Sequence, residues 1–154
     1  MTRIDFYFNV SNKQLALADL VQAAVSIRRQ VMICVADESS AAMISANLWQ
    51  QKPESFLPNV AANHVAAAQT PVVIHWQEMA LQKDELLINL RRDQPTFFSR
   101  FTHLIELVSD DEQDKIAARA RFKFYRDRGY DIKSVNYAQT SIVQSSSSKK
   151  IVRK

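Results

Sequence analysis

The stretch that most readily suggests chemistry is DDEQDKIAARARFKFYRDRGY, residues 110–130. Acidic residues come first and basic residues follow, which is the order of charge that stabilises a helix through its dipole. Gly129, the only glycine in the chain, stands where a left-handed residue would end that helix. A spacing of three or four residues places a set of side chains on one helix face. These are Lys115, Arg119, Phe122, Lys123 and Arg126.

A cationic helix face that carries a large aromatic ring can receive an acidic, partly apolar peptide. Arg119 can hold a carboxylate through its planar guanidinium, and Lys115 and Lys123 add positive charge around neighbouring acids. The stem of Arg119 and the ring of Phe122 can lie on either side of an apolar side chain. The alternative is a solvated helix face whose order of charge only suits the dipole.

A second candidate surface is LWQQKPESFLP, residues 48–58. Trp49, Phe56 and Leu57 lie there beside two prolines. Exposed aromatic residues next to rigid turns are typical anchors of protein interfaces. The alternative is that Trp49 and Phe56 cover the edge of the core, and the residues alone leave both interpretations open.

The elements that must position these surfaces alternate between strands and helices. Strands are predicted over residues 3–9, 31–36, 71–76, 85–91 and 102–108. Helices are predicted from Ser11 to about Arg28, from Asp37 to about Trp49 and over 110–128, with a short helical turn from Pro95. This order predicts a single three-layer α/β domain, in which helices flank a mostly parallel central sheet.

The net charge of +4 belongs to one end of the chain. Residues 141–154, SIVQSSSSKKIVRK, contain four basic residues and no acid, so 16 basic and 16 acidic residues remain elsewhere. A balanced body disfavours a broad DNA-binding surface. Four consecutive serines predict a flexible tail over 141–154, after a domain over 1–140. A direct single-stranded nucleic-acid-binding protein that uses the basic helix and this tail is the alternative function.

Several kinds of catalytic or cofactor site lack their usual residues. No turn after a strand contains the glycines of a phosphate loop, so dinucleotide and nucleoside triphosphate binding of the usual kinds is not expected. The three histidines are scattered, which disfavours a metal site, and His75 and His103 are interpreted as structural. Asp37 and Glu38 follow a strand, where an α/β enzyme could place its acids, although Asp37 is also a natural helix cap. We therefore expect no catalytic residues, metal or cofactor, and keep a small-molecule enzyme as a third hypothesis.

Compartment signals favour the cytoplasm. No apolar run approaches the ~18 residues of a transmembrane helix, so no membrane association is expected. The N-terminus, MTRIDFYFNV, is typical of a first strand rather than a secretion signal. The single cysteine, Cys34, lies in the apolar segment VMICVA, which excludes a disulfide within the chain.

Five segments, taken in order, resemble the chi subunit of bacterial DNA polymerase III, a component of the clamp-loader assembly. They are FYF, ADE, LWQQKPESFLPN, ELLINLR and KIAARARFKFYRDRGYDI, and the similarity runs from about Arg3 to Asn136. The family has an α/β fold that is similar to a nucleotide-binding domain but does not act as one. This agrees with the absence of a phosphate loop.

The resemblance implies two partners. Proteins of this family bind the acidic C-terminal tail of single-stranded DNA-binding protein, and the tail-binding positions correspond to Lys115, Arg119, Phe122 and Lys123. They also bind the psi subunit, which connects them to the clamp loader, at positions that correspond to Trp49 and Phe56. A repair helicase is a further partner at that second side. Phenylalanine at 122 departs from the family, where a tyrosine would add a hydroxyl.

The expected function is therefore a non-catalytic adaptor in DNA replication. It would join single-stranded DNA-binding protein to the polymerase clamp loader through psi and contact DNA only indirectly. The catalytic activity of such a polymerase complex lies in another subunit.

Overall fold

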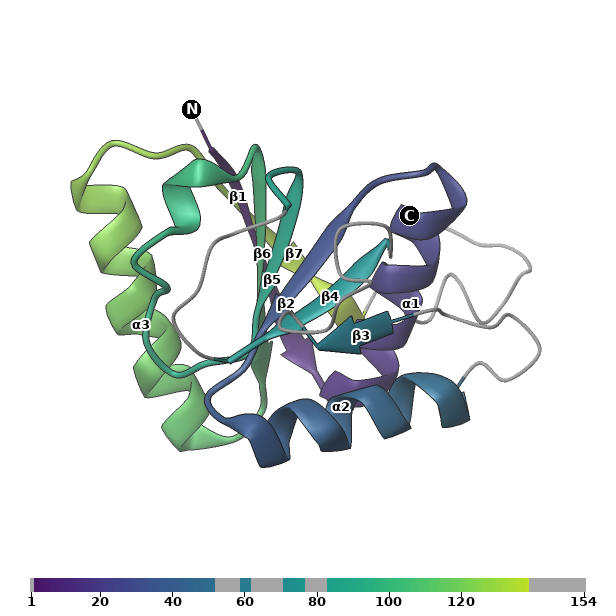
Figure 1. Ribbon diagram of the computed structural model, residues 1–154. Helices are drawn as coiled ribbons and strands as arrows, with labels where there is room; N and C mark the ends of the chain where they lie inside the picture. Colours follow the sequence, from purple (N-terminus) through teal and green to yellow (C-terminus); the bar gives the residue numbers. More distant parts are fainter. Residues whose placement is uncertain (1, 52–58, 62–70, 77–82, 139–154) are drawn as a thin grey trace, which may run out of the picture.

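The computed structural model describes residues 2–51, 59–61, 71–76 and 83–138 (Figure 1). Phe56, Leu57 and the tail over 141–154 lie outside the described residues, and so do the predictions made for them. In chain order the elements are β1 (Arg3–Val10), α1 (Lys13–Ser26), β2 (Val31–Cys34), α2 (Glu38–Gln51), β3 (Asn59–Ala61), β4 (Val72–His75), β5 (Leu86–Asn89), the 3-10 turn η1 (Phe98–Arg100), β6 (His103–Ser109), α3 (Glu112–Asp127) and β7 (Ile132–Asn136).

The described strands form one sheet in the order β3-β4-β2-β5-β6-β1-β7. Every neighbouring pair is parallel. Helices α1 and α2 pack on one face of this sheet and α3 packs on the other (Figure 1). The prediction of a three-layer α/β domain with a parallel central sheet is confirmed.

The alternation of side chains along the strands builds a separate apolar core on each face. Val31 and Ile33 of β2 join the core beneath α1 and α2, while Met32 and Cys34 join the core beneath α3. A strand covered on both faces must be apolar throughout, as the VMIC segment is. Burial of each such aliphatic side chain stabilises the fold by roughly 1.5–3 kcal/mol.

The predicted helices form, with one shift at a cap. Asn12, rather than Ser11, caps α1, because its side-chain oxygen accepts the Leu15 amide at 3.1 Å. Asp37 caps α2 through its carboxylate, which accepts the Ser40 amide at 2.8 Å. The interpretation of Asp37 as a helix cap is therefore confirmed.

Two strands were not predicted, and both are short strands at the edges of the sheet. β3 is only three residues long and falls in a segment for which no strand is predicted. β7 has the sequence IKSVN, with mixed exposure and no run of buried residues. The IKSVN segment therefore lacks the strong periodic pattern from which a strand is recognised.

None of the helices in the described segments combines the length and apolarity that a membrane crossing needs.

Candidate functional site

Helix α3 forms because local signals at both of its ends agree. The Asp111 side chain accepts the Asp114 amide at 3.0 Å and caps the first turn, where Glu112 adds a second acid. At the other end, the Gly129 amide donates to the Arg126 carbonyl at 2.9 Å. Gly129 has a φ of +84°, the left-handed conformation that glycine adopts without strain. The predicted helix and its glycine stop are confirmed.

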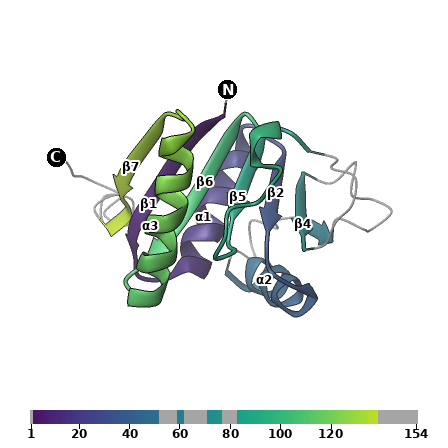
Figure 2. The same ribbon diagram turned by 90° about the vertical axis from the view of Figure 1, so that its left-hand side faces the viewer.

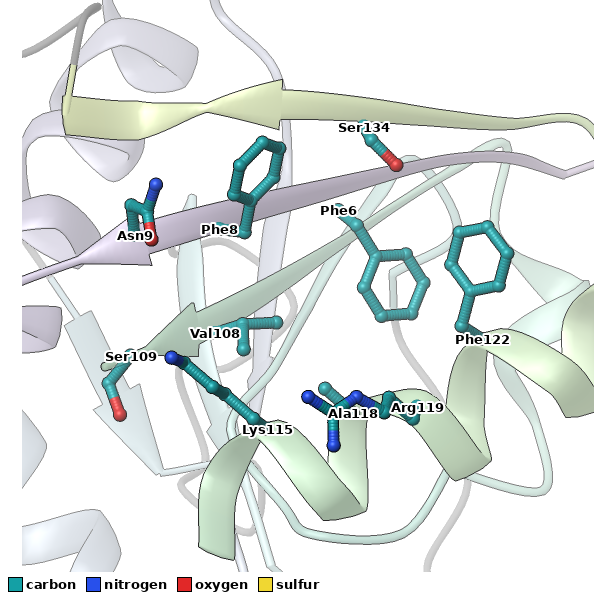
Figure 3. A pocket seen from close by; sticks show the side chains of 10 residues that line it. All are labelled: Phe6, Phe8, Asn9, Val108, Ser109, Lys115, Ala118, Arg119, Phe122 and Ser134. Carbon is teal, nitrogen blue, oxygen red and sulfur yellow. The ribbon is translucent and has the colours of Figure 1, made fainter. Parts of the chain in front are cut away.

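A groove of about 380 Å³ runs between α3 and strand β1 (Figure 3). Its lining comes from four elements that are distant in sequence: β1, the end of β6, α3 and β7. The lining residues are Phe6, Phe8, Asn9, Val108, Ser109, Lys115, Ala118, Arg119, Phe122 and Ser134. We call this feature the α3 groove.

The floor of the α3 groove is apolar at one end. The rings of Phe6 and Phe122 meet edge to face with centroids 5.3 Å apart, and Figure 3 shows them side by side. Phe8, two residues along β1, keeps 38% of its surface exposed although it is a large apolar residue. An exposed aromatic ring beside two packed rings offers a place for a further apolar side chain.

Two cationic side chains of α3 line the same groove: in Figure 3, Arg119 lies along the helix toward Lys115, and Lys115 is directed toward Ser109. Lys115 is half-buried and Arg119 is exposed. Within the described part of the chain, neither side chain is paired with a carboxylate. The α3 groove therefore combines an apolar floor with positive charges that are available to a negatively charged ligand.

Lys123 and Arg126 take a different position from the other predicted site residues. Both are exposed on α3, but neither lines the α3 groove. Each is directed to Asp127, with N–O distances of 2.8 Å for Lys123 and 3.6 Å for Arg126. Of the five residues predicted to bind a peptide tail, the structure brings Lys115, Arg119 and Phe122 together in the groove.

Arg121, between these residues in sequence, lies inside the protein. Its Nε contacts Glu106 Oε1 at 3.0 Å, and its Nη1 donates to the Arg92 carbonyl at 2.7 Å. Glu106 also accepts the Tyr125 hydroxyl at 2.6 Å and the Asn89 amide at 3.1 Å. Burial raises the pKa of Glu106, while Arg121, Tyr125 and Asn89 oppose that rise. This buried network ties α3 to β5 and β6.

Sequence reasoning missed the part of the groove that comes from the sheet. Phe6 and Phe8 belong to the strand predicted over residues 3–9, and the alternation of side chains along a strand places both rings on one face. It does not show that α3 covers one ring and leaves the other exposed. The contributions of Val108 and Ser134 arise only from the sheet order, in which β1 lies between β6 and β7.

The other sequence candidates have structural surroundings. The His103 Nε2 lies 2.8 Å from Asp5, its Nδ1 lies 3.2 Å from both Arg3 and Arg29, and burial lowers the pKa of the ring. His75 is buried in β4, with its ring 5.0 Å from that of Phe97. No cluster of His, Cys, Asp and Glu in the described segments could hold a metal ion.

The second predicted surface is described only in part. Trp49 belongs to the last turn of α2, on the face of the sheet opposite α3. Phe56 and Leu57 fall outside the described residues. Whether Trp49, Phe56 and Leu57 form one surface therefore stays a prediction.

Solved structures share this fold at low sequence identity. The C-terminal domain of the DEAD-box protein Dbp5 aligns with a TM-score of 0.59 and 12% identity, over 94% of this chain and 95% of that one. A variant of the Dbp5 C-terminal domain from S. cerevisiae aligns with a TM-score of 0.58, over 96% of this chain and all of that one. These likenesses show the α/β arrangement alone.

Sequence comparisons identify a family. The family described as "DNA polymerase III chi subunit, HolC" matches residues 1–133. DNA polymerase III subunit chi of Haemophilus influenzae is 33% identical, over 85% of this chain and 94% of that protein. The Pseudomonas aeruginosa subunit is 33% identical over 86% and 94%, and the Escherichia coli K12 subunit is 30% identical over 71% and 75%. The chain belongs to the chi subunit family of DNA polymerase III, whose members are accessory subunits of DNA replication.

Proposed function

We propose that this protein is a cytoplasmic, non-catalytic adaptor of DNA replication. It binds the acidic C-terminal tail of single-stranded DNA-binding protein and joins it to the clamp loader through the psi subunit. The observation that carries the proposal is the α3 groove, where Lys115 and Arg119 lie beside the rings of Phe6, Phe8 and Phe122 and have no carboxylate partner among the described residues.

The groove suits a peptide that ends in an aromatic residue and carries several acids before it. A terminal ring placed beside Phe8 and Phe122 would gain about 0.5–1.5 kcal/mol per aromatic pair beyond its buried area. Arg119 can take a carboxylate through two parallel N–H donors, and Lys115 adds a compact positive charge at the other end of the groove. Because both cations are at least partly exposed, salt should weaken the binding.

The decisive variant is Arg119→Ala. The exposed position of Arg119 predicts that its loss leaves the fold unchanged. We expect the affinity for the peptide to fall about 10–100-fold, which corresponds to about 1.4–2.8 kcal/mol. Titration calorimetry with a synthetic acidic peptide ending in phenylalanine measures this change, and circular dichroism checks the fold.

Arg100→Ala is the matched control. Arg100 is an exposed arginine at the end of η1 and lies outside the α3 groove, so this variant removes the same charge from another place. We expect its affinity to stay within about two-fold of the wild-type protein, as for most surface changes. Equal losses of affinity in both variants would mean that binding depends only on the net charge of the protein. An unchanged affinity in Arg119→Ala would remove the groove from consideration.

The connection to psi rests on the family resemblance at Trp49, Phe56 and Leu57. One described feature supports it: α2, which carries Trp49, packs on the opposite face of the sheet from α3. Partners at these two places would not compete for space. In a pull-down with both partners, we expect Phe56→Ala to lose psi but keep the acidic peptide, and Arg119→Ala to show the reverse. A repair helicase at the Trp49 side would compete with psi in the same experiment.

A further inference from the structure

Strand β7 closes one edge of the described sheet and borders the α3 groove. It pairs only with β1, in parallel, with Ile4 opposite Ile132 and Phe6 opposite Ser134. No strand of the described segments pairs with its outer side. Figure 2 shows β7 beyond β1 at the margin of the sheet, on the side away from β6.

The register determines which backbone groups of β7 face outward. The Ile4 amide donates to the Asp131 carbonyl at 3.2 Å, so the backbone groups of residue 131 face β1. Backbone groups alternate in direction along a strand, so those of Lys133 and Val135 also face β1. The N–H and C=O groups of Ile132 and Ser134 therefore face away from the sheet.

The α3 groove reaches the side of β7 where these groups lie. Ser134 lines the groove and is exposed, and its small side chain leaves room above the strand. A chain paired with the outer side of β7 would lie about 4.8 Å from β7 and roughly 10 Å from β1. Side chains on its α3 side could then reach over Ser134 into the groove, which Phe8, Lys115 and Arg119 also line.

We propose that the acidic peptide bound by this protein adds to the outer edge of β7 as a further strand. Its backbone pairs with Ile132 and Ser134, and alternate side chains enter the α3 groove. This inference rests on the proposed function and adds the mode of binding: main-chain hydrogen bonds supply part of the affinity and the groove supplies the selectivity.

The charges favour an acidic peptide over a second copy of this chain. Lys133, exposed on β7, is the kind of charged edge residue that discourages two identical edges from pairing. A second copy would bring its own Lys133 to the same edge. An acidic chain instead meets Lys133, Lys115 and Arg119 with opposite charge.

Amide hydrogen exchange, measured residue by residue by NMR, tests the inference in the full-length protein. In the free protein, the amides of Lys133 and Val135 should exchange slowly, and those of Ile132 and Ser134 should exchange fast. Saturation with the acidic peptide should slow Ile132 and Ser134 at least about ten-fold, as a new hydrogen bond of about 1.4 kcal/mol would.

Three outcomes would overturn the inference. If the peptide saturates the protein but leaves Ile132 and Ser134 unprotected, backbone pairing is wrong while the proposed function stands. If no peptide binds, the proposed function falls as well. If these amides become protected in the free protein as its concentration rises, the edge belongs to a second copy.

A pair of variants gives an independent test. Ser134→Pro removes the outward amide without removing a bond to β1, and proline is tolerated on edge strands. Ser134→Ala keeps the amide and removes only the hydroxyl. Because only the proline variant lacks the amide, we expect it to bind the peptide about 5–10-fold more weakly than the alanine variant. A proline variant that keeps a native spectrum and wild-type affinity would contradict the inference, and a peptide methylated at its backbone nitrogens provides the same test if that variant does not fold.

Discussion

Arg121→Met should destabilise this protein strongly, because it leaves a buried carboxylate without its cation. The Arg121 side chain is 2% exposed, and the Glu106 side chain beside it is fully buried. The variant loses the contact to Glu106 at 3.0 Å and the bond to the Arg92 carbonyl at 2.7 Å. Removal of one partner of a buried ion pair typically costs about 3–5 kcal/mol. Domains of this kind have about 5–15 kcal/mol in total, so at least a fifth of the stability would be lost.

The loss should depend on pH in a defined direction. Burial already raises the pKa of Glu106, and Arg121 opposes that rise, so its removal raises the pKa further. An acid with a raised pKa binds its proton more tightly in the folded state than in the unfolded state. Folding stability therefore recovers as the pH falls through that raised pKa. The deficit of Arg121→Met should be largest at neutral pH and smaller in mild acid, where Glu106 is protonated.

Urea unfolding followed by circular dichroism measures these differences. Arg119→Ala, two residues away but exposed, is the matched control and should change stability by less than about 0.5 kcal/mol. The double variant Arg121→Met, Glu106→Gln should regain much of the loss, because no charge is then left buried. A deficit below about 1 kcal/mol for Arg121→Met, or one that does not change with pH, would refute the reasoning.

Two further predictions concern the ends of α3. The Asp114 carboxylate accepts a hydrogen bond from the Ser109 amide and contacts Lys13, each at 2.8 Å. Burial alone would raise the pKa of Asp114, but these two contacts lower it by more, so the pKa is lowered overall. The folding stability that comes from a lowered carboxyl pKa is present at neutral pH and is lost as the pH falls through that pKa. In urea unfolding at neutral pH, Asp114→Asn should therefore lower the free energy of unfolding by about 1–2 kcal/mol, and in strong acid it should change nothing. Gly129→Ala should lower the free energy of unfolding by about 1 kcal/mol in the same assay. The cause is backbone strain alone, because the φ of +84° at this position is unfavourable for alanine, whereas an added methyl group would meet no atom within 4 Å.

Local signals explain which elements could be predicted from the sequence. Asp111 and Gly129 mark the ends of α3 by chemistry that acts within one turn, and the VMIC segment is apolar throughout because both of its faces are covered. β7 escaped prediction because it is an edge strand. Its IKSVN sequence is stabilised by pairing with β1, which lies more than a hundred residues earlier in the chain.

The candidate site shows the same limit at the level of single residues. Helical spacing places Arg121 with Ala118 and Tyr125, and this stripe is buried. Burial of an arginine there requires a carboxylate on another element, Glu106 of β6, which the spacing within α3 cannot reveal. Likewise, Phe6 and Phe8 share a face of β1, but only the position of α3 decides that Phe6 is 4% exposed and Phe8 38%.

The buried network also gives a physical reason why the candidate site does not lie at the carboxyl end of β5. In open α/β sheets, ligands usually bind at the carboxyl ends of the strands. Here the Asn89 amide, in the last residue of β5, donates to both the Asp93 carbonyl and Glu106, and Arg121 holds the Arg92 carbonyl. The loop after β5 is therefore tied across the end of its own strand by side chains from β6 and α3. The end of β5 is thus occupied by the protein's own side chains, and the concave surface that combines apolar and cationic side chains lies between α3 and β1. One helix thus serves both purposes: Arg121 anchors it to the sheet, and Arg119, two residues earlier and exposed, lines the α3 groove.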